Sequence, residues 1–154
     1  MSGKLTEKLE TMDEIMDMWD KDSKIDPTEL TQASIDTGKF HSKYMRLMTK
    51  HSFRLKSLET QYNNLYKDKR LYYTGKLSKE KLTKYGWEPF DYNLGMKNEL
   101  DSFFKSDSDL NEIDEKKFYH TKIVEFCEAV LKQLATRSYN ITNIIAFERM
   151  RMGG

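Results

Sequence analysis

The fold is decided by residues 27–75, which read PTELTQASIDTGKFHSKYMRLMTKHSFRLKSLETQYNNLYKDKRLYYTG. No proline follows Pro27 in this stretch, and mostly apolar residues recur along one seam at steps of three and four. The seam comprises Ala33, Thr37, Phe40, Tyr44, Leu47, His51, Leu55, Leu58, Tyr62 and Leu65. Such a rhythm, with one stutter near His51, is typical of a long helix in a coiled coil. It predicts a helix over 27–75 whose seam needs a partner helix.

The remaining sequence also favours helices. The chain of 154 residues contains 2 Pro and 7 Gly, too few to supply the turns of a many-stranded β protein. We predict an all-α fold, a long helical coiled-coil, hairpin-like rod with a C-terminal helical oligomerisation segment. We expect a single domain (1–154) with an acidic N-terminal helix (1–25), the long basic helix (27–75), a connection with short helices (76–107) and C-terminal helices (108–154). Asp26 is the expected N-cap of the long helix, and a break is expected near Ser138.

Charge is segregated along the chain although the formal net charge is only +1. Residues 1–38 contain 4 basic and 10 acidic side chains, whereas residues 39–84 contain 13 basic and 3 acidic ones. Residues 85–117 are acidic again, with 4 basic against 9 acidic side chains. A block of like charge repels itself, and a polyanionic partner is the usual reason for keeping one.

Two sets of basic residues are the candidate nucleic-acid contacts. A patch near the end of the long helix interleaves cations with tyrosines and comprises Lys67, Lys69, Arg70, Tyr72, Tyr73 and Lys76. A stripe on one helix face comprises Lys39, Lys43, Arg46, Lys50 and Arg54. Cations neutralise phosphates and aromatic rings stack on unpaired bases, so the patch suits single strands. The alternatives are that the stripe is a solvated coiled-coil flank and that Tyr72 and Tyr73 only anchor the helix end.

Signatures of catalysis and of metal or cofactor binding are lacking in the sequence. It has no phosphate-binding glycine loop, no H-E-x-x-H and no G-x-S-x-G. One cysteine, Cys127, excludes an internal disulfide and is expected in the core. We therefore expect a protein that is not an enzyme, holds no metal or cofactor, has no contact with membranes and is kept in a reducing cytoplasm.

The C-terminal stretch concentrates apolar side chains in a chain otherwise poor in them. Ile141, Ile144, Ile145 and Phe147 lie on more than one face of a helix, which predicts burial on both sides. A subunit interface is the simplest place for such a segment.

These features together resemble one known family. The Tyr-Tyr-Thr-Gly-Lys at 72–76 and the stretch IVEFCEAVLKQLATRSYNITNIIAFERMRMGG at 123–154 are similar to the UvsY recombination mediators of T-even-type bacteriophages and cyanophages. The family's Lys-x-Arg-Leu motif, which precedes Tyr-Tyr-Ser-Gly, falls on residues 67–70. The alignment leaves open whether Lys69 or Arg70 fills the family's Arg position.

The resemblance implies a factor for DNA recombination, repair and replication in the cytoplasm of the infected bacterial host. Such a factor forms a ring-like homo-oligomer, binds single-stranded DNA without sequence specificity and helps to load the phage recombinase (UvsX-like) onto DNA coated by the phage single-stranded-DNA-binding protein. In the family, the C-terminal helix builds the oligomer. The alternatives are a coiled-coil protein that binds RNA or duplex DNA and a structural or scaffold coiled coil of a virion.

Overall fold

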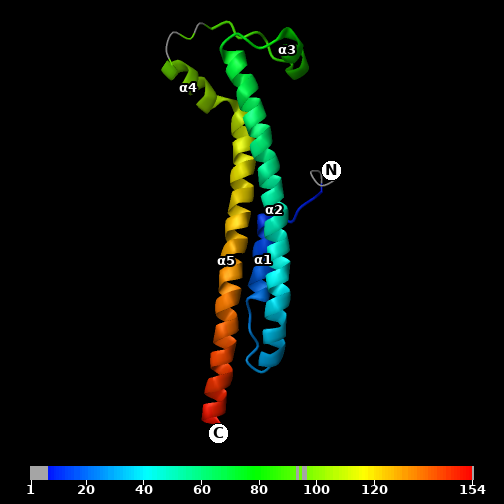
Figure 1. The fold of residues 1–154 in the computed structure, drawn as a ribbon, viewed down its shortest axis with the longest axis vertical. Helices are drawn as coiled ribbons and strands as arrows, with labels where there is room; N and C mark the ends of the chain where they lie inside the picture. The colour runs from blue at the N-terminus through cyan, green and yellow to red at the C-terminus, as the bar shows by residue number, and fades with distance from the viewer. Residues whose placement is uncertain (1–6, 93, 95–96, 154) are drawn as a thin grey trace. The chain divides into compact units, whose positions relative to one another are not determined.

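The computed structural model describes residues 7–92, 94 and 97–153. Five helices follow one another in this part of the chain: α1 (Met12–Asp22), α2 (Leu30–Tyr73), α3 (Lys79–Tyr85), α4 (Lys97–Ser106) and α5 (Ser108–Arg151) (Figure 1). The described residues include no β-strand. The all-α prediction is therefore confirmed. No helix in the described ranges is long and apolar enough to cross a membrane.

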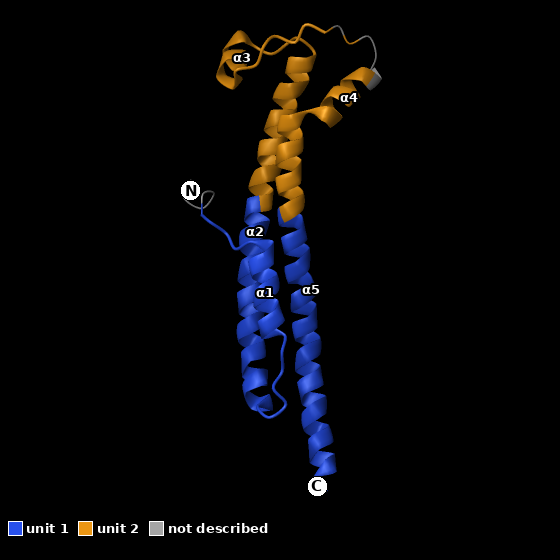
Figure 2. Ribbon diagram, turned by 180° about the vertical axis from the view of Figure 1, so that it is seen from behind, with its two compact units in different colours: residues 1–54, 120–154 blue, residues 55–119 orange. Residues whose placement is uncertain are grey.

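The chain divides into two compact units, each of which takes a part of both long helices (Figure 2). Unit 1 comprises Met1–Arg54 and His120–Gly154, and therefore contains α1, the first part of α2 and most of α5. Unit 2 comprises Leu55–Tyr119, and contains the end of α2, both short helices and the start of α5.

The seam predicted on α2 is the buried face of that helix. None of its ten residues is exposed. In unit 1, Tyr44 and Leu47 join Ile15 of α1 and four residues of α5 in one hydrophobic core, the four being Ile123, Cys127, Val130 and Leu134. Cys127 is buried there, as expected, and burial raises the pKa of its thiol to about 11. The partner helix that the seam requires is thus α5 of the same chain.

The starts of α1 and α2 both differ from the prediction. Thr11 caps α1 through a capping box with Glu14, so this helix begins at Met12. Residues 1–6 of the expected first helix lie outside the described residues. Asp26 does not cap α2, because its Oδ1 accepts hydrogen bonds from the backbone N–H and the hydroxyl of Thr28, at 2.9 and 2.6 Å. This local turn delays the start of α2 to Leu30.

The break expected near Ser138 does not occur, since α5 is one helix of 44 residues. No glycine or proline lies between Ser108 and Arg151, and nothing in the backbone therefore interrupts it. The Ser138 carbonyl accepts a hydrogen bond from the Thr142 hydroxyl at 3.1 Å, one turn further along the helix. Arg137 and Ile141, on either side, are both buried.

A pair of histidines lies buried between α2 and α5 in unit 1. His51 has no exposed surface, and its Nδ1 lies 2.9 Å from the Nδ1 of His120. One ring must donate and the other accept, so the pair cannot accommodate two imidazolium ions. Burial lowers the pKa of His51, with Arg54 and Lys50 adding to the effect and Glu10 opposing it. Burial, His51 and Arg54 lower the pKa of His120 to about 4.

Acidification is therefore expected to destabilise the protein. In the unfolded chain, histidines take up protons near pH 6.5, whereas the folded pair does so only at lower pH. The unfolded state then binds more protons, and stability falls as the pH is lowered from about 6.5 towards 4. His120→Gln should remove roughly half of the decline in urea midpoint between pH 7.5 and 5. His41→Gln, at an exposed position, should leave the decline intact. A midpoint that is flat with pH in the wild type would contradict this.

Candidate nucleic-acid interface

The basic patch lies at the C-terminal end of α2 in unit 2, where a glycine ends the helix. Gly75 has a φ of 73°, and the N–H groups of Gly75 and Lys76 donate to the carbonyls of Tyr72 and Leu71. Lys67, Arg70 and Lys76 are exposed and make no ion pair with a described residue. Lys67 and Arg70 are three residues apart and share one helix face. These three cations are available to phosphates.

Lys69, between them in sequence, is buried instead. Its Nζ lies 3.0 Å from Asp107 and 2.8 Å from Asp109, and 3.9 Å from the centre of the Trp87 ring. Only 5% of Lys69 is exposed. Two carboxylates and an aromatic ring of unit 2 surround this ammonium group, so Lys69 has a structural role and Arg70 is the accessible cation.

Asp107 connects the end of α2 to the start of α5. Its Oδ1 accepts the N–H of Leu110 at 2.9 Å and so caps α5, while its Oδ2 accepts the Tyr73 hydroxyl at 2.5 Å. Burial alone would raise the pKa of Asp107, but the hydrogen bonds from Tyr73, Leu110 and Lys69 outweigh it and lower the pKa. Burial, followed by the hydrogen bond to Asp107 and the negative charge of Asp107, raises the pKa of Tyr73. Asp107 is thus a buried carboxylate anion with its partners in place.

A second buried carboxylate ties α3 to α2. Asp68 accepts hydrogen bonds from the Lys81 ammonium at 2.8 Å and from the Tyr85 hydroxyl at 2.5 Å. Burial opposes its ionisation, but both hydrogen bonds favour the anion, and the pKa of Asp68 is lowered. In the sequence KDKR at 67–70, the outer two side chains therefore face solvent and the inner two are buried.

Tyr72 and Tyr73 are half-buried members of an aromatic cluster. The Tyr73 ring packs against Phe90, Phe103 and Phe104 at centroid distances of 5.0 to 5.7 Å. Tyr72 contacts Trp87 and Phe90, and its hydroxyl donates to the Glu88 carbonyl at 2.7 Å. This geometry matches the alternative in which the tyrosines anchor the helix end.

Several residues that form the rest of this region are not among the candidates predicted from the sequence. The aromatic residues of 87–104 follow the patch in sequence and pack back upon it, a contact that helical periodicity does not reveal. Lys79 and Lys84 of α3 are exposed cations of unit 2 and belong to the same basic block of the sequence. The density of charge in 76–84 was the signal for them.

The stripe from Lys39 to Arg54 belongs to unit 1 and runs along the side of α2 that faces α1. Lys39 and Arg46 are exposed, and Lys43, Lys50 and Arg54 are half-buried. Lys43 pairs with Asp22 at 2.6 Å, and Lys50 with Glu7 at 3.4 Å. The stripe is therefore partly neutralised by the acidic segment.

The four candidate oligomerisation residues differ in exposure. Ile141 is 2% exposed and is thus buried within its own chain, while Ile144 and Ile145 are half-buried. Phe147 is 64% exposed, as are Tyr139, Met150 and Met152 to similar or larger extents. The uncovered apolar surface of this segment is carried by these last four residues and not by Ile141.

Removing the Lys69 charge should destabilise unit 2. Lys69→Met leaves Asp107 buried without its cation, and breaking such a pair costs about 3–5 kcal/mol. Urea unfolding followed by Trp87 fluorescence in a Trp19→Phe background would report the loss, because Trp87 lies directly under the ammonium group. Lys67→Met, at an exposed position, should change the free energy of unfolding by less than about 0.5 kcal/mol. Equal effects of the two substitutions would refute the structural role of Lys69.

The fold of this chain is similar to that of proteins of known structure. Two crystal structures of the bacteriophage T4 recombination mediator protein UvsY have the same fold. The type II lattice form matches with a TM-score of 0.76 at 20% identity, covering 94% of this chain and 99% of that one. The type I form matches with a TM-score of 0.75 at 20% identity, covering 88% and 97%.

Comparison by sequence gives the family. No curated protein matches the chain. The family model described as "Recombination, repair and ssDNA binding protein UvsY" matches residues 18–154, which include all of α2 to α5 and both sets of basic residues. The chain therefore belongs to the UvsY family.

Proposed function

We propose that this protein is a recombination mediator. It binds single-stranded DNA without sequence specificity, as a homo-oligomer, and assists loading of the phage recombinase onto DNA coated by the phage single-stranded-DNA-binding protein. It acts without catalysis, in the cytoplasm of the infected host. Membership of a family described by recombination, repair and single-stranded DNA binding supports this function.

The observation that supports the proposal best is that residues 67–70 of the basic patch have two different roles, structural for the buried pair and available to a ligand for the exposed pair. Asp68 and Lys69 are buried in polar networks that fix the end of α2, and these networks hold Lys67 and Arg70 on the exposed face. Because the backbone of this segment is already fixed, only the side chains of these cations lose conformational freedom when they meet a phosphate. Lys67, Arg70 and Lys76 are the first-choice contacts, with Lys79 and Lys84 beside them in sequence on α3.

Repetition of this patch in an oligomer would convert weak contacts into tight binding. A few phosphate contacts per subunit give modest, salt-sensitive affinity. Several subunits that engage one strand raise the affinity by avidity, because each later contact is intramolecular. The exposed apolar side chains of the C-terminal segment, Phe147 among them, supply a surface for such assembly.

The patch is tested by replacing its two helical cations. Lys67→Ala with Arg70→Ala should weaken binding of an oligo(dT) strand about tenfold and reduce the salt slope by about 0.7 for each phosphate that is no longer neutralised. Fluorescence anisotropy over a series of salt concentrations measures both. Lys24→Ala with Lys132→Ala removes the same charge at exposed positions of unit 1 and should have little effect. Equal weakening in the two variants would assign binding to net charge alone. Tighter binding to a duplex of equal length would contradict the preference for single strands.

The mediator role has a separate readout. Assembly of the phage recombinase on a strand precoated with single-stranded-DNA-binding protein should be faster with the wild-type protein than without it. The Lys67→Ala/Arg70→Ala variant should lose most of this acceleration. Acceleration by a variant that no longer binds DNA would exclude the proposed mechanism.

The oligomer interface is tested by substitution in preference to truncation, because truncation before Ser138 would also remove Ile141, which is buried within the chain. Phe147→Asp should lower the mass in sedimentation equilibrium from that of an oligomer to that of small species, since a buried aromatic anchor contributes about 2 kcal/mol or more per interface. Phe53→Asp is the control, at a phenylalanine 69% exposed on α2. An unchanged mass for Phe147→Asp would place the interface elsewhere.

A further inference from the structure

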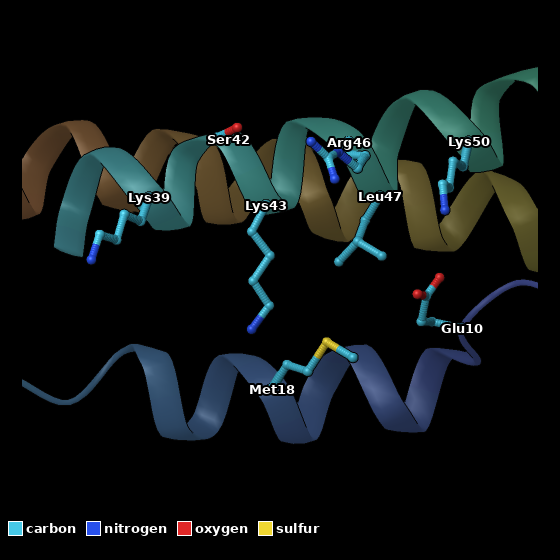
Figure 3. A pocket seen from close by; sticks show the side chains of 8 residues that line it. All are labelled: Glu10, Met18, Lys39, Ser42, Lys43, Arg46, Leu47 and Lys50. Atoms are coloured by element: carbon cyan, nitrogen blue, oxygen red, sulfur yellow. The ribbon is translucent and has the colours of Figure 1, made fainter.

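A basic groove lies in unit 1 between α1 and α2 and has a volume of about 390 Å³. Figure 3 shows the side chains of Lys39, Lys43 and Lys50 extending from α2 toward α1. Arg46 and Ser42 also line the groove, with Met18 and Leu47 as apolar lining. The cations recur every three or four residues, so they are spaced about 4.5 to 6 Å apart along the helix axis. A row of this kind can follow the backbone of an extended polyanion.

Carboxylates of the same chain already hold half of this row. Asp22 pairs with Lys43 at 2.6 Å, and Glu7 pairs with Lys50 at 3.4 Å. The backbone carbonyl of Glu7 also accepts a hydrogen bond from Arg54 at 2.7 Å. Oxygen atoms of the acidic segment therefore occupy the positions beside these cations that phosphate oxygens would take in a complex.

The other half of the row is open. Lys39 and Arg46 are exposed and make no ion pair within the described part of the chain. On the opposite wall, Oε2 of Glu10 is buried and has no hydrogen-bond partner there. A buried carboxylate oxygen without a partner is unfavourable. Of the two ion pairs across the groove, the longer and more exposed one, between Glu7 and Lys50, is the one that a competing anion can replace more readily.

We propose that this groove is a second binding site for the phosphodiester backbone of single-stranded nucleic acid, and that Glu7 and Asp22 are internal competitors for it. This proposal rests on the proposed function. A strand that enters the groove meets Lys39 and Arg46 first. Its phosphates then replace the carboxylates that pair with Lys43 and Lys50. The groove therefore binds more weakly than its count of cations suggests.

The exchange needs only local movement. Ile15 has no exposed surface and anchors α1 in the core of unit 1, so α1 stays in place. Glu7 precedes α1 and its side chain is 51% exposed, which leaves it able to swing into solvent. Asp22 is held more firmly, because it also accepts the Tyr44 hydroxyl at 3.0 Å. Glu7 is therefore the competitor that can be removed without disturbing the fold.

The test is Glu7→Gln in the full-length chain. Loss of one exposed competing charge should tighten binding of oligo(dT) by about two- to fivefold at low salt. The salt slope should become steeper by up to about 0.7, because one more phosphate is engaged. Asp17→Asn is the matched control, since it removes the same charge from an exposed position of α1 that does not line the groove. Equal tightening by the two variants would overturn the proposal and assign the effect to net charge.

A second set of variants tests whether the extra affinity of Glu7→Gln for oligo(dT) arises in the groove. Lys39→Ala with Arg46→Ala should abolish the extra affinity of Glu7→Gln, and persistence of that affinity would overturn the proposal. Competition by dTMP at the same phosphate concentration as the strand should be negligible, and effective competition would overturn the assignment to a polymer backbone. If the wild-type protein bound no oligo(dT) in any salt, the proposed function would fail. Binding by the wild type without a specific effect of Glu7→Gln would leave that function intact and refute only the groove.

Discussion

The buried carboxylate of Asp107 is the constraint on which the architecture of unit 2 depends. It caps α5, accepts the Tyr73 hydroxyl and pairs with Lys69, so one group determines where α5 begins beside the end of α2. Each of these contacts satisfies a polar atom that would otherwise be buried alone, which is costly in a small core. Polar contacts of defined geometry therefore help to fix the register of α2 against α5 in this unit.

The same chain uses its cations in three different ways. In unit 2, Lys69 and Lys81 neutralise buried carboxylates, whereas Lys67 and Arg70 remain exposed on the intervening face. In unit 1, the stripe is partly neutralised by Glu7 and Asp22. Residues 55–119 contain 12 basic and 12 acidic side chains, so the net charge of this segment is zero. Binding of a polyanion therefore depends on the positions of individual charges and not on the net charge, because screening confines the field of each charge to about 10 Å at 0.1 M salt.

Hydrophobic periodicity predicted most of the fold. It failed where local hydrogen bonds determine the start of a helix and where a partner distant in sequence determines the burial of a side chain. The seam from Ala33 to Leu65 is the buried face of α2, because burial of one helix face is a property that spacing records directly. The predicted starts of α1 and α2 were wrong, because they depend on local hydrogen bonds of Thr11 and Asp26. Several neighbouring polar residues could have made equivalent hydrogen bonds, so the sequence alone does not select the cap. Among the site residues, Lys67 and Arg70 lie on the exposed face, as DNA contacts require. The burial of Lys69 depends on Asp107, 38 residues away, and no local pattern encodes it.

The exposure of apolar side chains in the C-terminal half of α5 is likewise not determined by periodicity alone. Spacing identified an apolar segment, but the structure divides it between Ile141, which the chain buries itself, and Phe147, which it leaves 64% exposed. An apolar side chain left in solvent gives up about 25 cal/mol for each Å² that burial would remove from water. Phe147, Met150 and Met152 lie near the end of α5, beyond Ile141, the last buried residue of the described chain. In the oligomer that we propose, this surface would be buried against other copies of the chain.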